Sequence, residues 1–201
     1  FMPRQCPPRS EWASAAYKMA AERIEKVRKS RSATLSLTQR ASLASLPPLD
    51  GLENVTRLDL WGTHVSDISE LSKLRNLTHL NLSSTGVTSL QSLEGLRKLS
   101  HLEISRTGVH DLTPTSSLQS LVFFRAYGFS GRDLTAMSNW KSIRTILLSG
   151  AGMVSDSRPL AELTELRHLD ISHTKISDIT FLAQLPHLSR VGISGLHIPR
   201  F

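Results

Sequence analysis

The sequence has little cysteine, few aromatic residues and no long apolar run. Cys6 is the only cysteine among 201 residues, so a disulfide framework is excluded. No stretch approaches the roughly 18 consecutive apolar residues that a membrane-spanning helix requires. Only 11 residues are aromatic, whereas 32 are leucine and 29 are serine. This composition predicts a core built largely from one repeated side chain.

The first residues lack the apolar segment of a secretory signal, because Phe1 to Arg9 is polar. We therefore expect an intracellular protein, with the cytoplasm as the first choice. An organellar location is the alternative, since the N-terminal stretch is rich in arginine and serine. Glu11, Glu22 and Glu25 weaken that alternative, because targeting segments of this kind carry few acidic residues.

Positive charge is concentrated in the first 40 residues. They carry nine basic and three acidic side chains, whereas residues 41–201 carry 15 basic and 14 acidic ones. Within this basic arm, Ser10 is expected to cap a helix from Glu11 to about Lys29. One face of the helix is apolar, and the basic side chains lie mainly around and beyond it. The apolar face comprises Trp12, Ala13, Ala16, Ala20, Ile24 and Val27, and the basic residues are Arg23, Lys26, Arg28, Lys29 and Arg31.

Two interpretations of this helix are open, and they are compatible. In the first, the helix covers the open end of a repeat core and exposes a solvated basic side. In the second, the five basic residues bind RNA, an acidic protein or an anionic membrane. The cap is favoured, because the ends of a solenoid must be covered.

A 22-residue repeat fills the rest of the chain. Within each unit the apolar residues recur at fixed offsets, and one further position is threonine in four of the units. The leucines between Leu35 and Leu52 fit the same frame with one inserted residue. The first apolar position falls at Val55, Leu77, Leu99, Leu121 and Ile143, then at Leu166 after 23 residues and at Leu188 after another 22.

The pattern LxxLxLxxTxVxDIxxLxxLxx closely resembles the leucine-rich repeat in its short, 22-residue form. It is most similar to the phosphatase-regulator and internalin-like subclasses, over roughly Ser32 to Phe201. The expected fold is an α/β solenoid, a horseshoe with a parallel concave sheet, 3₁₀ or extended convex segments and an N-terminal helical cap. Residues 1–31 then form the basic arm and capping helix, and residues 32–201 form the repeat domain.

Threonine stands where most families of this type carry asparagine. An asparagine side chain at this position usually bonds the backbone of neighbouring turns. We expect the threonine hydroxyl to form part of the same ladder.

Each L-x-L step predicts a short strand with alternating sides, so about eight parallel strands should stack at a spacing near 4.8 Å. The later apolar residues recur every three positions, which suits a 3₁₀ or extended return segment. Two units depart from the rule: the one from Leu121 is rich in aromatic residues, and the one from Ile143 has one extra residue before Val154. The strands are expected at residues 35–37, 58–60, 80–82, 102–104, 124–126, 146–148, 169–171 and 191–193.

Residues between and just after the strand leucines are expected to line the concave surface in three columns. These columns mix both signs of charge and contain no lysine, which argues against a general phosphate-binding face. Their middle is rich in aromatic residues and arginine, the composition of a protein interface hot spot. Alternatively, the aromatic side chains pack down over the irregular unit. The predicted protein contacts are Trp61, His101, Arg106, Phe123, Arg125 and Tyr127.

Catalysis, metal binding and a cofactor are not expected. His79 and His101 share a column on adjacent strands, but His168 lies three strands further on, too far to complete a zinc site. Residues 170–173 contain the residue types of a hydrolase triad, without a visible oxyanion hole or pocket. No glycine-rich phosphate loop and no H-E-x-x-H helix occurs.

No polar cap follows the apolar residues of the last unit, which include Val191, Ile193 and Ile198. An uncovered solenoid end exposes apolar side chains and a strand edge, so association through this end is expected. Coverage by a partner, by Phe201 folding back or by a longer chain all fit.

These features together predict a non-enzymatic scaffold that binds a protein partner through its concave face. The alternative is a subunit of a ribonucleoprotein assembly, such as an organellar ribosome, anchored by the basic arm. Protein binding predicts that Tyr127→Ala and Arg125→Ala abolish association, while deletion of residues 1–31 has little effect. RNA attachment predicts the reverse, with an affinity that falls steeply as salt rises.

Overall fold

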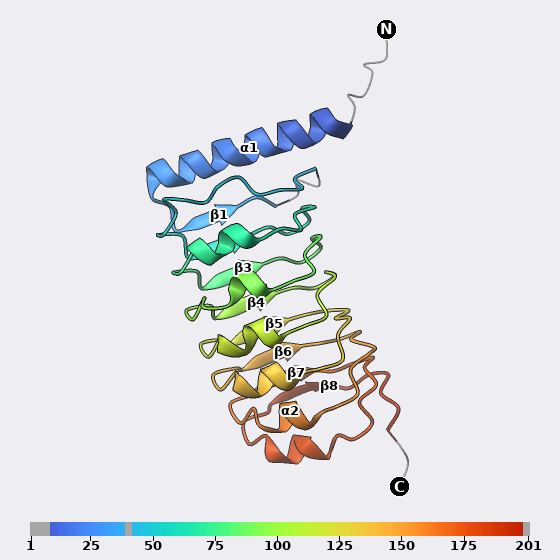
Figure 1. Ribbon diagram of the computed structural model, residues 1–201. Helices are drawn as coiled ribbons and strands as arrows, with labels where there is room; N and C mark the ends of the chain where they lie inside the picture. Colours follow the sequence, from blue (N-terminus) through green and yellow to red (C-terminus); the bar gives the residue numbers. More distant parts are fainter. Residues whose placement is uncertain (1–8, 39–41, 199–201) are drawn as a thin grey trace.

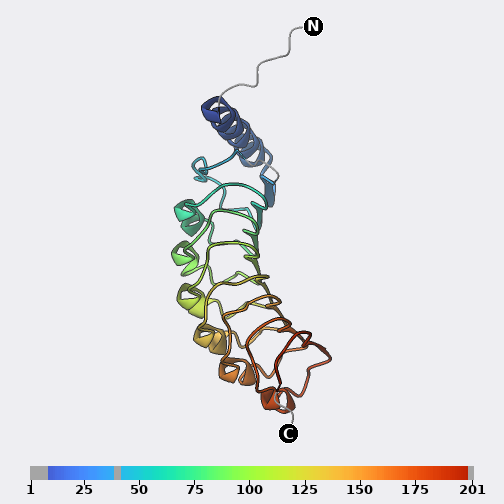
Figure 2. The same cartoon turned by 90° about the vertical axis from the view of Figure 1, so that its right-hand side faces the viewer.

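The computed structural model describes residues 9–38 and 42–198. These residues form a curved stack of turns, with helix α1 (Arg9–Ser30) lying across the first turn (Figure 1). Each turn adds one three-residue strand to a sheet on the concave side and returns along the convex side (Figure 2). The strands are β1 (Thr34–Ser36), β2 (Arg57–Asp59), β3 (His79–Asn81), β4 (His101–Glu103), β5 (Phe123–Arg125), β6 (Thr145–Leu147), β7 (His168–Asp170) and β8 (Arg190–Gly192).

The sheet of the described residues has eight parallel strands in sequence order, as the repeat predicted. Its register is uniform, so that Leu58 pairs with Leu80 and Leu80 with Leu102. Each strand begins one residue earlier than predicted. The second leucine of each L-x-L step lies at the exit of the strand, where its N–H still bonds the next turn: Leu60 N donates to the carbonyl of Asn81 at 2.9 Å.

Short 3₁₀ segments form most of the convex side, as the three-residue spacing predicted. Several of them follow an aspartate whose carboxylate accepts a backbone N–H two residues further on, as Asp67 does from Ser69 at 2.8 Å. This hydrogen bond favours the ionised carboxylate and lowers the pKa of Asp67. The segments are η1 (Ser69–Lys73), η2 (Gln91–Leu93), η3 (Thr113–Ser117), η4 (Thr135–Asn139) and η5 (Thr180–Gln184), and a four-residue helix α2 (Arg158–Ala161) takes this place in the unit from Ile143.

The repeat threonines bond within their own turn, so the expected ladder between turns was wrong. The Thr63 hydroxyl donates to the Leu60 carbonyl at 2.9 Å, because its short branch reaches the carbonyl three residues before it. Asparagine bridges the turns from a different position: Asn76 Nδ2 donates to the Glu53 carbonyl at 2.7 Å. The bond within the turn recurs at Thr85, Thr107 and Thr174.

Aromatic side chains of the irregular unit divide between the core and the surface. Phe124 and Trp140 are fully buried, with ring centres 4.8 Å apart. Phe129 is buried in the same core. Phe123 is half-buried, whereas Tyr127 is 49% exposed, so Tyr127 does not pack down as the alternative supposed.

Helix α1 caps the first turn, which confirms the predicted N-terminal helix. It begins at Arg9, so the prediction of Ser10 as its N-cap was wrong. Ala16, Ala20, Ile24 and Val27 from its apolar face are buried in the same core as the strand leucines. Trp12 and Ala13, also predicted on this face, lie on the described backbone, but their side chains are outside the part that the structure describes. At the far end, Val191, Ile193 and Ile198 are exposed on the last described turn. None of the helices described is long and apolar enough to cross a membrane.

Candidate functional site

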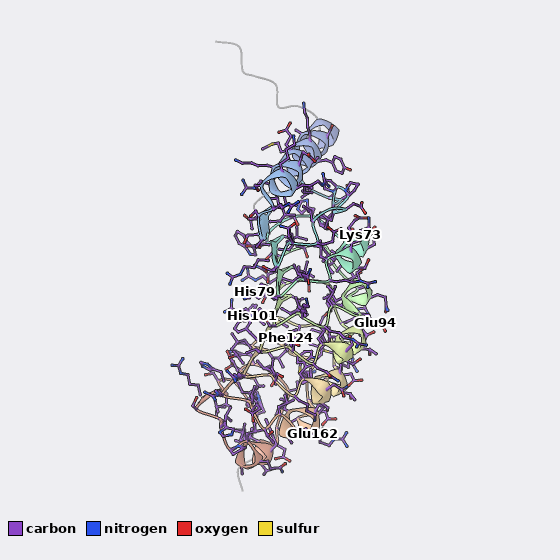
Figure 3. The ribbon with its side chains drawn as sticks, turned by 90° about the vertical axis from the view of Figure 1, so that its left-hand side faces the viewer. Lys73, His79, Glu94, His101, Phe124 and Glu162 are labelled. Atoms are coloured by element: carbon purple, nitrogen blue, oxygen red, sulfur yellow. The ribbon has the colours of Figure 1, made fainter. Side chains whose placement is uncertain are left out.

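Three columns of side chains line the concave surface. They consist of the first residue of each strand, the third residue, and the residue two positions beyond the strand. The middle strand residue is buried, as in β3 and β4. Figure 3 shows His79 and His101 on this sheet side, and Lys73, Glu94 and Glu162 on the side of the convex segments. The first column is Thr34, Arg57, His79, His101, Phe123, Thr145, His168 and Arg190; the second is Ser36, Asp59, Asn81, Glu103, Arg125, Leu147, Asp170 and Gly192; the third is Thr38, Trp61, Ser83, Ser105, Tyr127, Ser149, Ser172 and Ser194.

A hollow of about 450 Å³ lies between Trp61 and Tyr127, which are 43% and 49% exposed. Ser83 and Ser105 form its floor. Each hydroxyl oxygen accepts a backbone N–H from the next turn, at 3.2 Å from Ser105 N and 3.1 Å from Tyr127 N, so small side chains are held rigidly there. Three strand spacings separate the two aromatic ends, which corresponds to about 14 Å.

Two arginines border this hollow at its Tyr127 end. The Arg106 guanidinium lies 5.6 Å from the centre of the Tyr127 ring, within cation–π range. Arg125 pairs with Glu103 at 3.0 Å and lies 5.3 Å from the centre of the Phe123 ring. The predicted contact residues on β4, β5 and the loops after them therefore come together, and Trp61 lies at the other end of the hollow.

Arg106 adopts a backbone conformation that favours glycine. Its φ is 55°. The equivalent residue is glycine in some turns, as at Gly62 and Gly128 with φ of 71° and 69°, whereas Ser84 and His173 adopt a φ of 57° in two others. A left-handed conformation costs a non-glycine residue energy, and the turns that carry arginine, serine or histidine here all bear that cost. The guanidinium is therefore kept beside Tyr127 at an energetic cost to the fold.

His79, His101 and Phe123 form a stack along the first column. The two imidazole centres are 4.1 Å apart with planes 10° from parallel, and the Phe123 ring centre lies 5.7 Å from His101. The lone pairs of an imidazole lie in its ring plane, so two parallel rings do not point them at one ion. No group of three histidine, cysteine or acidic side chains suited to a metal occurs among the described residues.

Hydroxyl groups orient both histidines. The Thr78 hydroxyl donates to the Thr56 carbonyl at 2.9 Å, so its oxygen accepts a hydrogen bond from His79 Nδ1 at 2.8 Å. Ser100 does the same for His101. Burial lowers the pKa of His79, and the neighbouring charges of His101 and Arg57 lower it further. The pKa of His101 is also lowered, first by burial and then by Arg57, against the opposing effect of Glu103.

The histidine stack makes the fold less stable in mild acid. The folded pKa of each histidine lies below the ordinary 6.5. At a pH between the folded pKa and 6.5, the unfolded chain therefore binds more protons than the folded chain. The stack's contribution is therefore complete above pH 6.5 and is lost as the pH falls toward the folded values. Urea unfolding of the double variant His79→Gln/His101→Gln between pH 7.5 and 5.5 should show about half the pH-dependent loss of the parent protein. The exposed His187→Gln is the control, and an unchanged loss in the double variant would refute this role.

An edge column, which the sequence analysis left out, lies beside the first column. It consists of the residue immediately before each strand, and the contact of Thr78 with His79 shows that these side chains border the concave face. Arg144 and Arg167 belong to it and are exposed. Strand alternation predicts that every second residue faces the concave side, and it therefore does not point to the residue just before each strand. The recurrence of arginine just before two neighbouring strands is the signal that marks this column.

One basic residue of the arm helps to hold the capping helix in place. Arg28 donates from Nε and from its terminal nitrogen to the Asp50 carbonyl, at 3.0 and 2.8 Å, and also pairs with Glu25. Lys29 lies 3.8 Å from the same glutamate. Arg23, Lys26 and Arg31 are exposed. Of the five predicted nucleic-acid contacts, Arg28 is thus committed to holding the helix on the first turns.

Solved structures of several other proteins share this architecture. An internalin, InlF, from Listeria monocytogenes is 27% identical with a TM-score of 0.61 over 76% of this chain and 52% of that chain, so this chain spans about half its length. Internalin C2 from the same organism is 21% identical, with a TM-score of 0.71 over 90% and 96% of the chains. TLR13, in a complex with ssRNA13, is 20% identical with a TM-score of 0.68 over 90% and 31%. No protein-family model and no curated protein matches the sequence.

Proposed function

We propose that this chain, a leucine-rich-repeat protein by its sequence pattern and its solenoid, is a scaffold that binds a protein partner on its concave face. Solenoids of this kind typically bind partners there. The observation that supports the proposal most is the hollow between Trp61 and Tyr127. Two large aromatic side chains stay exposed at its ends, beside arginines, and this composition is typical of interface hot spots.

The hollow suits an extended segment that runs along the solenoid. A span of about 14 Å accommodates about four residues of extended chain. In this arrangement Trp61 and Tyr127 anchor apolar side chains of the partner, and Arg106 donates hydrogen bonds beside Tyr127. Arg125, His101 and Phe123 extend the contact toward the first column. We propose no catalytic activity, since solenoids of this fold are generally non-enzymatic.

The proposal is tested by capture of partners from native extract with two variants that spare the core. We expect Tyr127→Ala to weaken capture at least about tenfold, the effect of a hot-spot residue. Arg106→Gly should also weaken it, yet leave the free energy of unfolding within about 1 kcal/mol, because relief of strain offsets the added chain entropy.

Tyr17→Ala is the matched control, because Tyr17 is 40% exposed on α1, away from the hollow. A partner captured equally well by Tyr127→Ala and Tyr17→Ala would refute binding at the hollow. Thermal unfolding of each variant confirms that the fold is retained.

An RNA-anchored role of the basic arm is the competing proposal and needs a different test from deletion. Removing residues 1–31 would also remove the buried face of α1, so loss of binding would carry no information about charge. Charge reversal at the exposed Arg23 and Lys26 keeps the cap. Capture that is sensitive to RNase and falls with this double substitution would favour the ribonucleoprotein role over the concave-face scaffold.

A further inference from the structure

A strip of basic and aromatic side chains borders the concave face on the side where the strands begin. This edge strip consists of the edge column and the first column from β2 to β8, residues 56–57, 78–79, 100–101, 122–123, 144–145, 167–168 and 189–190. Its 14 positions hold four arginines, three histidines and no acidic residue. The acidic residues of the three predicted columns all stand in the second column, where Arg125 is the one basic side chain and pairs with Glu103.

Arginines crowd together at the C-terminal part of the strip. Arg167 N and His168 N both donate to the Arg144 carbonyl, at 2.9 and 3.0 Å, and Arg190 N donates to the Arg167 carbonyl at 3.1 Å. Arg144 and Arg167 thus hold equivalent places on adjacent turns, about 4.8 Å apart, and Arg190 lies on the next turn opposite His168, one residue further along the strand. All three are exposed, and within the described part of the chain none forms an ion pair with an acidic side chain. Like charges on adjacent strands repel, and an anionic partner lying across them relieves that repulsion.

A stripe of acidic side chains runs parallel to the strip. Asp59, Glu103 and Asp170 belong to the second column, two residues further along the strands and hence about 7 Å away. The carboxylates of Asp59 and Asp170 are held in place by the backbone N–H groups of Trp61 and Ser172, at 3.0 and 2.9 Å. A nucleic acid backbone is uniformly negative and is repelled by this stripe. A polypeptide can present acidic residues to the edge strip and basic residues to the acidic stripe.

We propose that Arg144, Arg167 and Arg190, with His168 between them, dock an acidic segment of a polypeptide partner. The three guanidinium groups receive carboxylates through paired hydrogen bonds, which arginine forms better than lysine because of its planar fork. This inference rests on the proposed function, since it names the chemistry of the protein partner. It adds a second contact region beside the hollow.

The test measures binding of a fluorescein-labelled octaglutamate peptide by anisotropy. The parent protein should bind it with an affinity that falls as salt rises, and should not bind an octaglutamine peptide. R144E/R167E/R190E should lose at least about tenfold in affinity. The control R75E/R97E/R132E makes the same change in net charge at exposed positions outside the strip, and should stay within about twofold. Circular dichroism and thermal unfolding verify that both triple variants are folded.

Two results would overturn the inference. An equal loss in the control variant would show that net charge alone drives binding. Tighter binding of a 12-nucleotide oligouridylate than of octaglutamate, lost in the same strip variant, would assign the strip to nucleic acid. The hollow is tested separately, because Tyr127→Ala should leave octaglutamate binding unchanged while it weakens capture of the partner.

Discussion

Replacement of Trp140 by alanine is expected to lower the free energy of unfolding by about 4 kcal/mol. Trp140 is fully buried at a position where the two preceding turns carry Leu96 and Leu118, and it packs against Phe124. Its indole Nε1 donates to the Thr115 carbonyl at 3.0 Å. Alanine leaves a cavity the size of the indole and also removes one of the two hydrogen bonds that this carbonyl accepts, the other coming from Leu118 N at 3.0 Å.

The variant Trp140→Leu separates these two contributions. It restores the residue that the repeat uses elsewhere and fills most of the space, but it still removes the hydrogen bond to Thr115. We expect it to lose about 2 kcal/mol, measured by urea unfolding alongside the alanine variant. A loss below about 2 kcal/mol in Trp140→Ala would mean that neighbouring turns collapse into the cavity, and would contradict this expectation.

Ile24→Asp is expected to have an effect of similar size, at least about 4 kcal/mol, because it places a carboxylate in the apolar contact between α1 and the first turn. Ile24 is only 2% exposed and belongs to the same core as Leu35 and Leu37. Loosening the helix uncovers those leucines, so the variant should also associate in solution, as measured by light scattering.

Arg23→Asp on the exposed side of the same helix is the matched control. It changes the arm's charge by one unit more than Ile24→Asp does, and it should alter stability by no more than about 0.5 kcal/mol. If both variants were equally destabilised, charge on the helix would matter more than the buried contact, and the capping role of α1 would be refuted.

The cap changes how the basic arm is understood. From the sequence alone, deletion of residues 1–31 is expected to distinguish RNA attachment from protein binding. The structure makes the same segment a part of the core, through Ala20, Ile24 and Val27 and through the bonds of Arg28 to Asp50. Only the exposed basic residues of α1 are free to be altered without disturbing the fold.

The sequence by itself determined the solenoid. A 22-residue apolar period brings equivalent leucines to equivalent places in successive turns, so the strand count, the uniform register and the convex 3₁₀ segments all follow from one pattern. The apolar face of α1 was equally visible, because helical periodicity depends on residues only three or four positions apart. These features are local, or they repeat a local rule.

Tertiary structure decided the contacts between turns. The stack of His79 on His101 and the bond from Trp140 to Thr115 depend on side-chain rotamers set by neighbours 22 and 25 residues away. The edge strip also depends on contacts between turns. Arg144 and Arg167 immediately precede their strands, and Arg167 N bonds the Arg144 carbonyl of the turn before it. A period specifies which residues are buried, whereas the packing of adjacent turns specifies which surface residues meet.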